Sequence, residues 1–183
     1  VPSVKMLISS CSLGIVAFVG EIASAVTTMV FNFVLLGLDG NTAVAAYGVI
    51  ANTALVGTAI FNGVSQGLQP LASEAHAKGE AEEKKKILTK SVLTGIVLTV
   101  VLIGSVWIFA PQITDVFNSE HSEQLAAYAV PGIRIYFAGF FAAAINIIFA
   151  GFLSATDHAK ESSIVAITRG IVAIIAFALV LPK

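Results

Sequence analysis

Glu21 is the residue whose type and position most strongly suggest chemistry, because it lies inside a long apolar stretch. A charged side chain at the centre of a membrane-spanning helix costs roughly 2.5–3.5 kcal/mol on insertion scales, so it needs a functional reason. With about 100° of rotation per residue, Thr28 and Asn32 lie within about 20° of Glu21 on one helix face. This polar line predicts the wall of a water-filled cavity; the alternative is a helix–helix contact that hydrogen-bonds Glu21.

Polar amides lie in two later apolar stretches. Asn62 and Gln69 share one face near the end of the second stretch, and Asn146 lies at mid-depth in the fourth. Gly63 and Gly67 would let another helix approach closely, but the pair alone is a weak signal and is more typical of ordinary packing. Amides at this depth either orient a ligand or hydrogen-bond to a neighbouring helix.

Arg134 lies near the start of the fourth stretch. Its guanidinium either extends to the outer membrane interface or faces a cavity, and both alternatives stay open. The candidate ligand-binding residues are therefore Glu21, Thr28, Asn32, Asn62, Gln69, Arg134 and Asn146.

Patterns typical of enzymes and metal sites are absent from the sequence. It has no H-E-x-x-H, Walker A, G-x-S-x-G or C-x-x-C motif, and Cys11 is its single cysteine. The histidines fall between the apolar stretches without a spaced partner. We therefore expect no enzyme, no catalytic residue, no cofactor and no resident metal.

The composition predicts an integral membrane protein. The 183 residues include ten Lys or Arg and eleven Asp or Glu, which is 11% charged against about 25% in ordinary soluble domains. Hydrophobic residues make up 57%, and the mean hydropathy is +0.92. One soluble core cannot hide so much apolar surface, so lipid is the expected partner. The net charge of −1 gives no sign of nucleic-acid binding.

Five apolar stretches are long enough to cross a membrane as helices. They cover about residues 9–38, 43–71, 91–109, 131–153 and 164–181. We therefore expect an all-α, multi-pass helical bundle, with residues 1–183 forming a single transmembrane domain. Pro70 and Pro111 are predicted at helix ends, and Pro131 at a helix start.

The charges between the stretches predict the orientation. The predicted loop 72–90 holds five lysines, whereas the segments 39–42 and 112–124 carry acids and no base. By the positive-inside rule, loop 72–90 is cytoplasmic, and the other two segments lie on the opposite, outer side of the cell membrane. The odd number of spans, and a sequence that stops in an apolar run, suggest a piece of a larger protein.

The end of the second stretch carries a recognisable motif. Residues 63–71 read GVSQGLQPL, which resembles the G-x-x-x-G-x-Q-P-L signature of multidrug and toxic compound extrusion (MATE) transporters. Residues 133–137 (IRIYF), 144–147 (AINI) and 168–170 (TRG) follow in the family's order. The resemblance covers nearly the whole chain, which is similar to spans seven to eleven of that family.

The resemblance implies one lobe of a two-lobe, twelve-helix transporter, whose missing first lobe would be a partner. It implies export of cationic or amphipathic small molecules in exchange for Na⁺ or H⁺. Glu21 matches an acidic position that some members use for cations or substrates. Residues 135–156 hold no charge, unlike the tenth span of some members, and residues 72–77 depart from the usual ending of the motif.

Two alternatives are weighed against this interpretation. A flippase for lipid-linked oligosaccharides, from the same superfamily, tends to need several basic residues for a pyrophosphate, and only Arg134 and Arg169 lie within the predicted spans. A non-transporting membrane protein is the second alternative.

Overall fold

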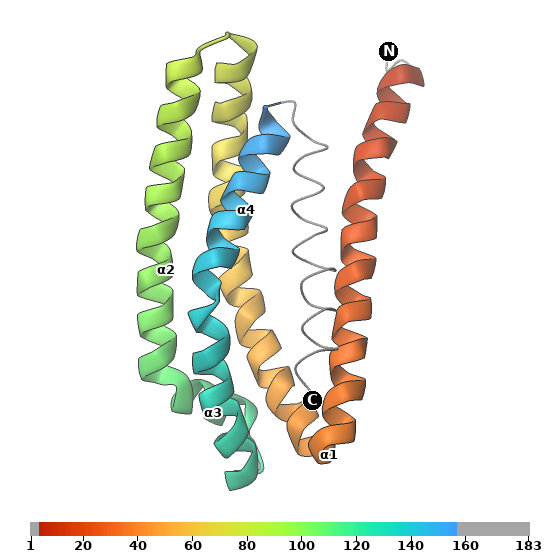
Figure 1. The fold of residues 1–183 in the computed structure, drawn as a ribbon, viewed down its shortest axis with the longest axis vertical. Coiled ribbons are helices and arrows are strands. Elements are labelled where there is room, and N and C mark those ends of the chain that lie inside the picture. Colours follow the sequence, from red (N-terminus) through yellow and green to blue (C-terminus); the bar gives the residue numbers. More distant parts are fainter. Residues whose placement is uncertain (1–3, 157–183) are drawn as a thin grey trace.

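The computed structural model describes the backbone of residues 4–156 and the side chains of Ile22 and residues 25–156. The predicted fifth span, 164–181, and the side chain of Glu21 lie outside the described residues. The described part consists of the helices α1 (Val4–Ala77), α2 (Ala81–Phe117), α3 (Glu123–Ala138) and α4 (Phe140–Ala155) (Figure 1).

Helix α1 is a hairpin with a sharp turn. Its 74 residues would form a straight rod of about 110 Å, far longer than the roughly 30 Å of a bilayer core. The backbone leaves the helical conformation at Asp39 and Gly40. Gly40 has φ of +64°, which glycine adopts without a steric penalty. The turn divides α1 into a first arm, residues 4–38, and a second arm, residues 41–77, which diverge from the turn in Figure 1.

Two side-chain contacts hold this turn in place. The rings of Phe31 and Tyr47 stack across the hairpin with centroids 5.5 Å apart. The carboxylate of Asp39 accepts a hydrogen bond from the hydroxyl of Tyr128, which precedes the predicted fourth span.

The predicted loop 72–90 is wrong in its extent, because only the short connection 78–80 separates α1 from α2. Glu74 and Lys78, four residues apart, form an ion pair of 2.6 Å on the helix surface, so charged residues extend the helix past the apolar stretch. The backbone N–H groups of Gly79 and Glu80 then close the end of α1 by donating to the carbonyls of His76 and Ala75. This Schellman arrangement uses the positive φ of Gly79.

The prolines do not mark helix edges as predicted. Pro70, Pro111 and Pro131 all lie inside helices, in α1, α2 and α3. Helices of membrane proteins tolerate proline where other groups compensate the lost backbone hydrogen bond. Each helix therefore continues on both sides of its proline and extends beyond the predicted apolar stretch.

The predicted span 131–153 is a broken helix that begins earlier, at Glu123. Helices α3 and α4 meet at Gly139 with a bend of 45°. Within the described residues, two helices are long and apolar enough to cross a membrane, and the bent pair raises this number to three.

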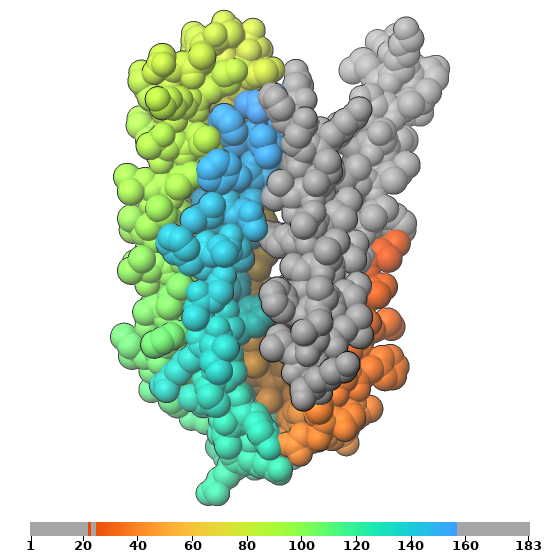
Figure 2. Space-filling view, viewed as in Figure 1, coloured from red at the N-terminus to blue at the C-terminus, as the bar shows by residue number. Residues whose placement is uncertain are grey.

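The core lies among the second arm of α1 and helices α2, α3 and α4. Its largest fully buried side chains include Phe61, Ile133, Phe137 and Ile148. The ring of Phe137 stacks on Phe140, with centroids 4.6 Å apart, directly across the α3–α4 break. Figure 2 shows α3 and α4 covering the middle of one face, beside α2.

Glycines let these helices approach closely at points that differ from the predicted ones. No described atom comes within 4 Å of a Cβ placed on Gly63 or Gly67, so the expected close contact there is absent from the described part. Instead, Gly57 faces the ring of Phe140, where an added Cβ would lie 2.8 Å from Cε1. Three other glycines face side chains of neighbouring helices in the same way: Gly95, Gly132 and Gly151.

We expect Gly57→Val to destabilise the protein by about 1–3 kcal/mol, because the new side chain would overlap Phe140 and Leu102. The matched control is Gly104→Val, since Gly104 is exposed and has nothing within 4 Å of its Cβ position. The measurement is the melting temperature of the purified complete protein in detergent. Equal melting temperatures for the two variants would contradict the packing described here.

The orientation stays a prediction that cysteine labelling tests. On a Cys11→Ser background, single cysteines at the exposed positions Asn41 and Ser119 should react with an impermeant thiol reagent added outside the cell. A cysteine at Glu82, in the first turn of α2, should stay protected. The opposite labelling pattern would invert the proposed topology.

Candidate functional site

The first arm of α1 positions the predicted polar line of Glu21, Thr28 and Asn32. Glu21 lies in the helical backbone of this arm, while its side chain is outside the described residues. The side chain of Thr28 is hydrogen-bonded to Tyr47 of the second arm. Asn32 is half-buried, and its side chain makes no hydrogen bond to any residue of 25–156. Thr28 thus attaches this line to the second arm, whereas Asn32, which lies nearer the turn, makes no hydrogen bond within the described residues.

Tyr47 is a residue of this region that the sequence analysis missed. It contacts the first arm twice, through the hydrogen bond to Thr28 and through the stacked ring of Phe31. The available signal was a tyrosine in an apolar helix, since its hydroxyl needs a hydrogen-bond partner when it is removed from water. Tyr47 is half-buried, and its two contacts hold the two arms together near the turn.

Asn62 and Gln69 lie seven residues apart on the second arm of α1, so they share a helix face as predicted, but they differ in burial. Asn62 is exposed, whereas Gln69 is half-buried and lies against α4. The Nε2 atom of Gln69 is 3.5 Å from the Cβ position of Gly151, and the buried Ser65 packs on the same glycine. Gln69 therefore contributes to helix packing, while Asn62 contacts solvent or partners outside the described residues.

Asn146 lies on the side of α4 that points away from the core. Ala144, Ile148 and Gly151 form the buried face of this helix, and Asn146 is rotated from them by roughly 140–160°. It is half-buried and makes no hydrogen bond to a described residue. Asn146 thus resembles Asn32, because neither amide makes a hydrogen bond within residues 25–156.

Arg134 is engaged with a neighbouring helix. Its Nε donates a hydrogen bond of 3.3 Å to the carbonyl of Trp107 in α2, and the indole Nε1 of Trp107 donates one of 3.1 Å to the carbonyl of Arg134. Both side chains are exposed on the surface formed by α2 and α3. The structure therefore does not bring Arg134 together with Thr28, Asn32 or Asn146 in one described site.

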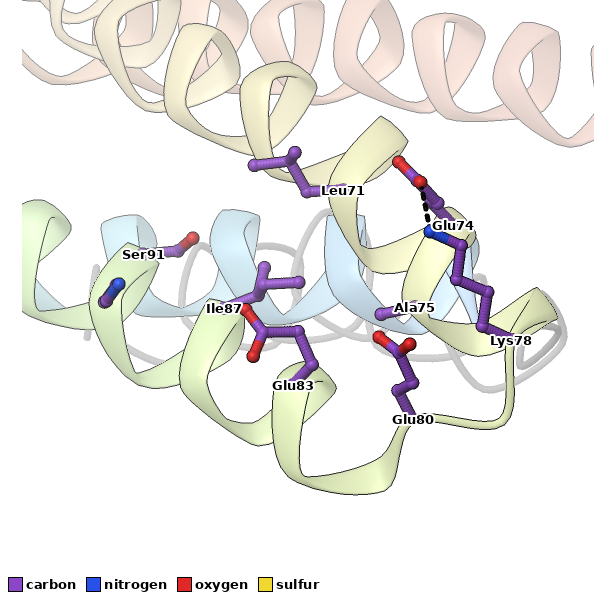
Figure 3. Close-up of a pocket in the computed structure, with 9 residues that line it drawn as sticks. Leu71, Glu74, Ala75, Lys78, Glu80, Glu83, Ile87 and Ser91 are labelled. Carbon is purple, nitrogen blue, oxygen red and sulfur yellow. Dashed lines mark hydrogen bonds and ion pairs between the residues drawn. The ribbon is translucent and has the colours of Figure 1, made fainter.

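A separate cavity lies outside the predicted spans, at the end where α1 meets α2. It has a volume of about 360 Å³, and Figure 3 shows the side chains of Glu80 and Glu83 beside it. Leu71 and Ile87 supply apolar lining, and the Glu74–Lys78 ion pair lies at its edge. The hydrogen bond and charge of Lys78 lower the pKa of the Glu74 carboxyl, and Glu74 likewise raises the pKa of Lys78.

No group of three or more His, Cys, Asp or Glu side chains able to hold a metal is found among the described residues. The predicted cation position depends on Glu21 and stays a prediction. The described contacts define a helical bundle. In it, the amides of Asn32 on the first arm and Asn146 on α4 make no hydrogen bond to a described residue.

Comparison with known proteins shows the family. Residues 8–180 match the MatE family model. The chain belongs to the MatE family. The matched region covers nearly the whole of this MatE chain. The comparison with curated proteins finds no match.

Solved structures show the same fold. One is the outward-facing conformation of a multidrug resistance MATE family transporter of the MOP superfamily, with a TM-score of 0.89 and 15% identity. Another is MATE in complex with MaL6, with a TM-score of 0.86 and 14% identity. Each match covers 98% of this MatE chain, but only 40% and 41% of the solved chains. The predicted family and the predicted all-α membrane fold are confirmed, and the chain spans about two fifths of such a transporter.

We expect Asn32→Ala and Asn146→Ala in the complete protein to reduce transport by several-fold with little change in membrane abundance. The reason is that neither amide is used by the described packing. Gln69→Ala is the matched control, because Gln69 packs against α4 and its loss should lower stability. Parallel losses of abundance and transport in both asparagine variants would show that these amides serve packing instead.

Proposed function

We propose that the complete protein exports cationic or amphipathic small molecules across the cell membrane in exchange for Na⁺ or H⁺. The observation that carries this proposal is the match of residues 8–180 to the MatE family. The fold supports it, because it is shared with a multidrug resistance MATE family transporter over nearly the whole of this chain. On this proposal, the part absent from this chain, including the first lobe, supplies the other wall of the transport path.

Glu21 is the proposed coupling carboxylate of this lobe. It is the only acid inside a predicted span, and its helix continues toward Thr28 and Asn32. A carboxylate in an apolar bundle is costly to leave bare, so it takes up H⁺, binds Na⁺ or pairs with a cationic substrate. Because one group serves each of these ligands in turn, ion entry competes with substrate binding and drives its release.

The open amides would complement this carboxylate. Asn32 lies about 11 residues beyond Glu21 on the same helix face, at a distance of roughly 16 Å along the axis. An amphipathic cation of drug size could therefore extend from the carboxylate toward Asn32, where the amide offers a donor and an acceptor. Asn146 of α4 is the second amide that could contribute to such a path.

Lipid is the proposed partner of the outer surface. Large apolar side chains are strongly exposed on the described helices, among them Ile135 at 76%, Phe33 at 75% and Ile108 at 69%. Water would disfavour a surface of this kind, whereas hydrocarbon or the missing lobe would cover it without cost.

The test is Glu21→Gln in the complete transporter. Glutamine keeps the size and hydrogen-bonding capacity of the side chain but cannot titrate or carry charge. We expect normal membrane abundance and a loss of ion-driven export of at least about tenfold, with partial activity in Glu21→Asp. The measurement is efflux of a cationic dye from vesicles under an imposed Na⁺ or H⁺ gradient.

The matched control is Glu120→Gln, which removes an exposed acid of the connection between α2 and α3 and should leave export unchanged. Wild-type export in Glu21→Gln would assign the coupling to the missing lobe. No dye export by the wild-type protein under either gradient, together with movement of a lipid-linked oligosaccharide, would instead support a flippase.

A further inference from the structure

Pro111 leaves one backbone carbonyl of α2 without its regular donor. In an α-helix the N–H of each residue donates to the carbonyl four positions earlier, and proline has no N–H. Pro111 lies inside α2, so the carbonyl that loses its donor is that of Trp107. An unsatisfied carbonyl is costly where the surroundings are apolar.

Arg134 supplies the missing donor from another helix. Its Nε lies 3.3 Å from the Trp107 carbonyl oxygen and donates to it. The indole Nε1 of Trp107 donates in return to the carbonyl of Arg134, at 3.1 Å. Each residue therefore binds the backbone of the other with its side chain, which makes a double connection between α2 and α3.

The other interior prolines show that this arrangement is specific. Pro70 and Pro131 free the carbonyls of Gln66 and Ala127 in the same way. No side chain in residues 25–156 donates to either carbonyl. Among the described residues Arg134 also forms no ion pair, so its contact with Trp107 accounts for its described polar interactions.

We propose that Arg134 is a positioning residue that replaces the backbone hydrogen bond removed by Pro111 and holds α3 against α2. It is then not a substrate or ion ligand. Arg134 lies four residues before Ala138, where α3 ends, and Gly139 follows with the 45° bend. The double connection therefore ties α3 to α2 just before the bend of the broken span at Gly139.

A double-mutant cycle tests this proposal in the complete transporter. Arg134→Ala should lower the melting temperature by roughly 2–5 °C, because it leaves the Trp107 carbonyl unpaired. Pro111→Ala restores a backbone N–H to that carbonyl. In the Pro111→Ala background, Arg134→Ala should therefore lower the melting temperature by less than half as much.

Trp107→Phe is the matched control. It removes the indole donor but keeps the aromatic ring and the Trp107 backbone carbonyl, so the loss that it causes should not be repaired by Pro111→Ala. Additive effects of Arg134→Ala and Pro111→Ala, or equal repair of Trp107→Phe, would overturn the proposal. If Arg134→Ala fails to accumulate in the membrane, the abundance of the double variant replaces the melting temperature. Recovery then supports the proposal, and no recovery overturns it.

Transport kinetics separate positioning from ligand binding. A positioning role predicts that Arg134→Ala lowers the maximal export rate with less than a twofold change in KM, and that Pro111→Ala recovers part of the rate. A ligand role predicts a raised KM that Pro111→Ala does not correct, and this result would overturn the proposal. Only this kinetic arm depends on the proposed export function; the melting temperatures stand without it.

Discussion

Hydrocarbon offers no hydrogen-bond partner to a peptide group, and the described structure follows from this constraint. Helices satisfy most of the backbone internally, and the remaining groups are satisfied at defined places. Gly79 allows the end of α1 to be closed by backbone bonds. The side chain of Asn118 exchanges two hydrogen bonds with the backbone of Ser122, so the exit from α2 is also paired. Both of these helix ends lie outside the predicted spans, where water is an alternative partner. The Trp107 carbonyl lies within the predicted span 91–109, and there Arg134 supplies the donor.

The helical class could be predicted from the sequence, whereas the helix boundaries could not. Apolar stretches report the thickness of the hydrocarbon, and a helix does not have to stop where the lipid ends. Glu74 and Lys78 continue α1 because they are good helix formers that pair on its surface. Pro131 was placed at a start because proline interrupts isolated helices, yet α3 begins eight residues earlier, with Ser122 capping the N–H of Leu125.

The candidate site could be predicted by residue type more readily than by contact. Charged and amide residues within apolar stretches are visible in a sequence. Two of them, Asn32 and Asn146, have side chains that make no hydrogen bond to a described residue. The partners of Thr28 and Arg134 depend on how helices cross, which helical periodicity alone does not specify. Tyr47 and Trp107 were therefore missed as partners, although a hydroxyl and an indole N–H in apolar helices both require one.

The glycine contacts have a consequence for how freely this sequence can change. Close approach of the helices depends on a few positions without a side chain, such as Gly57 against Phe140. Exposed apolar positions such as Val101 would, on the proposal above, contact lipid, which is a fluid that accepts any aliphatic shape. Substitution can therefore replace most of the apolar surface while the helix crossings persist. A small set of helix–helix contact positions therefore specifies the fold, and most of the remaining apolar residues are interchangeable.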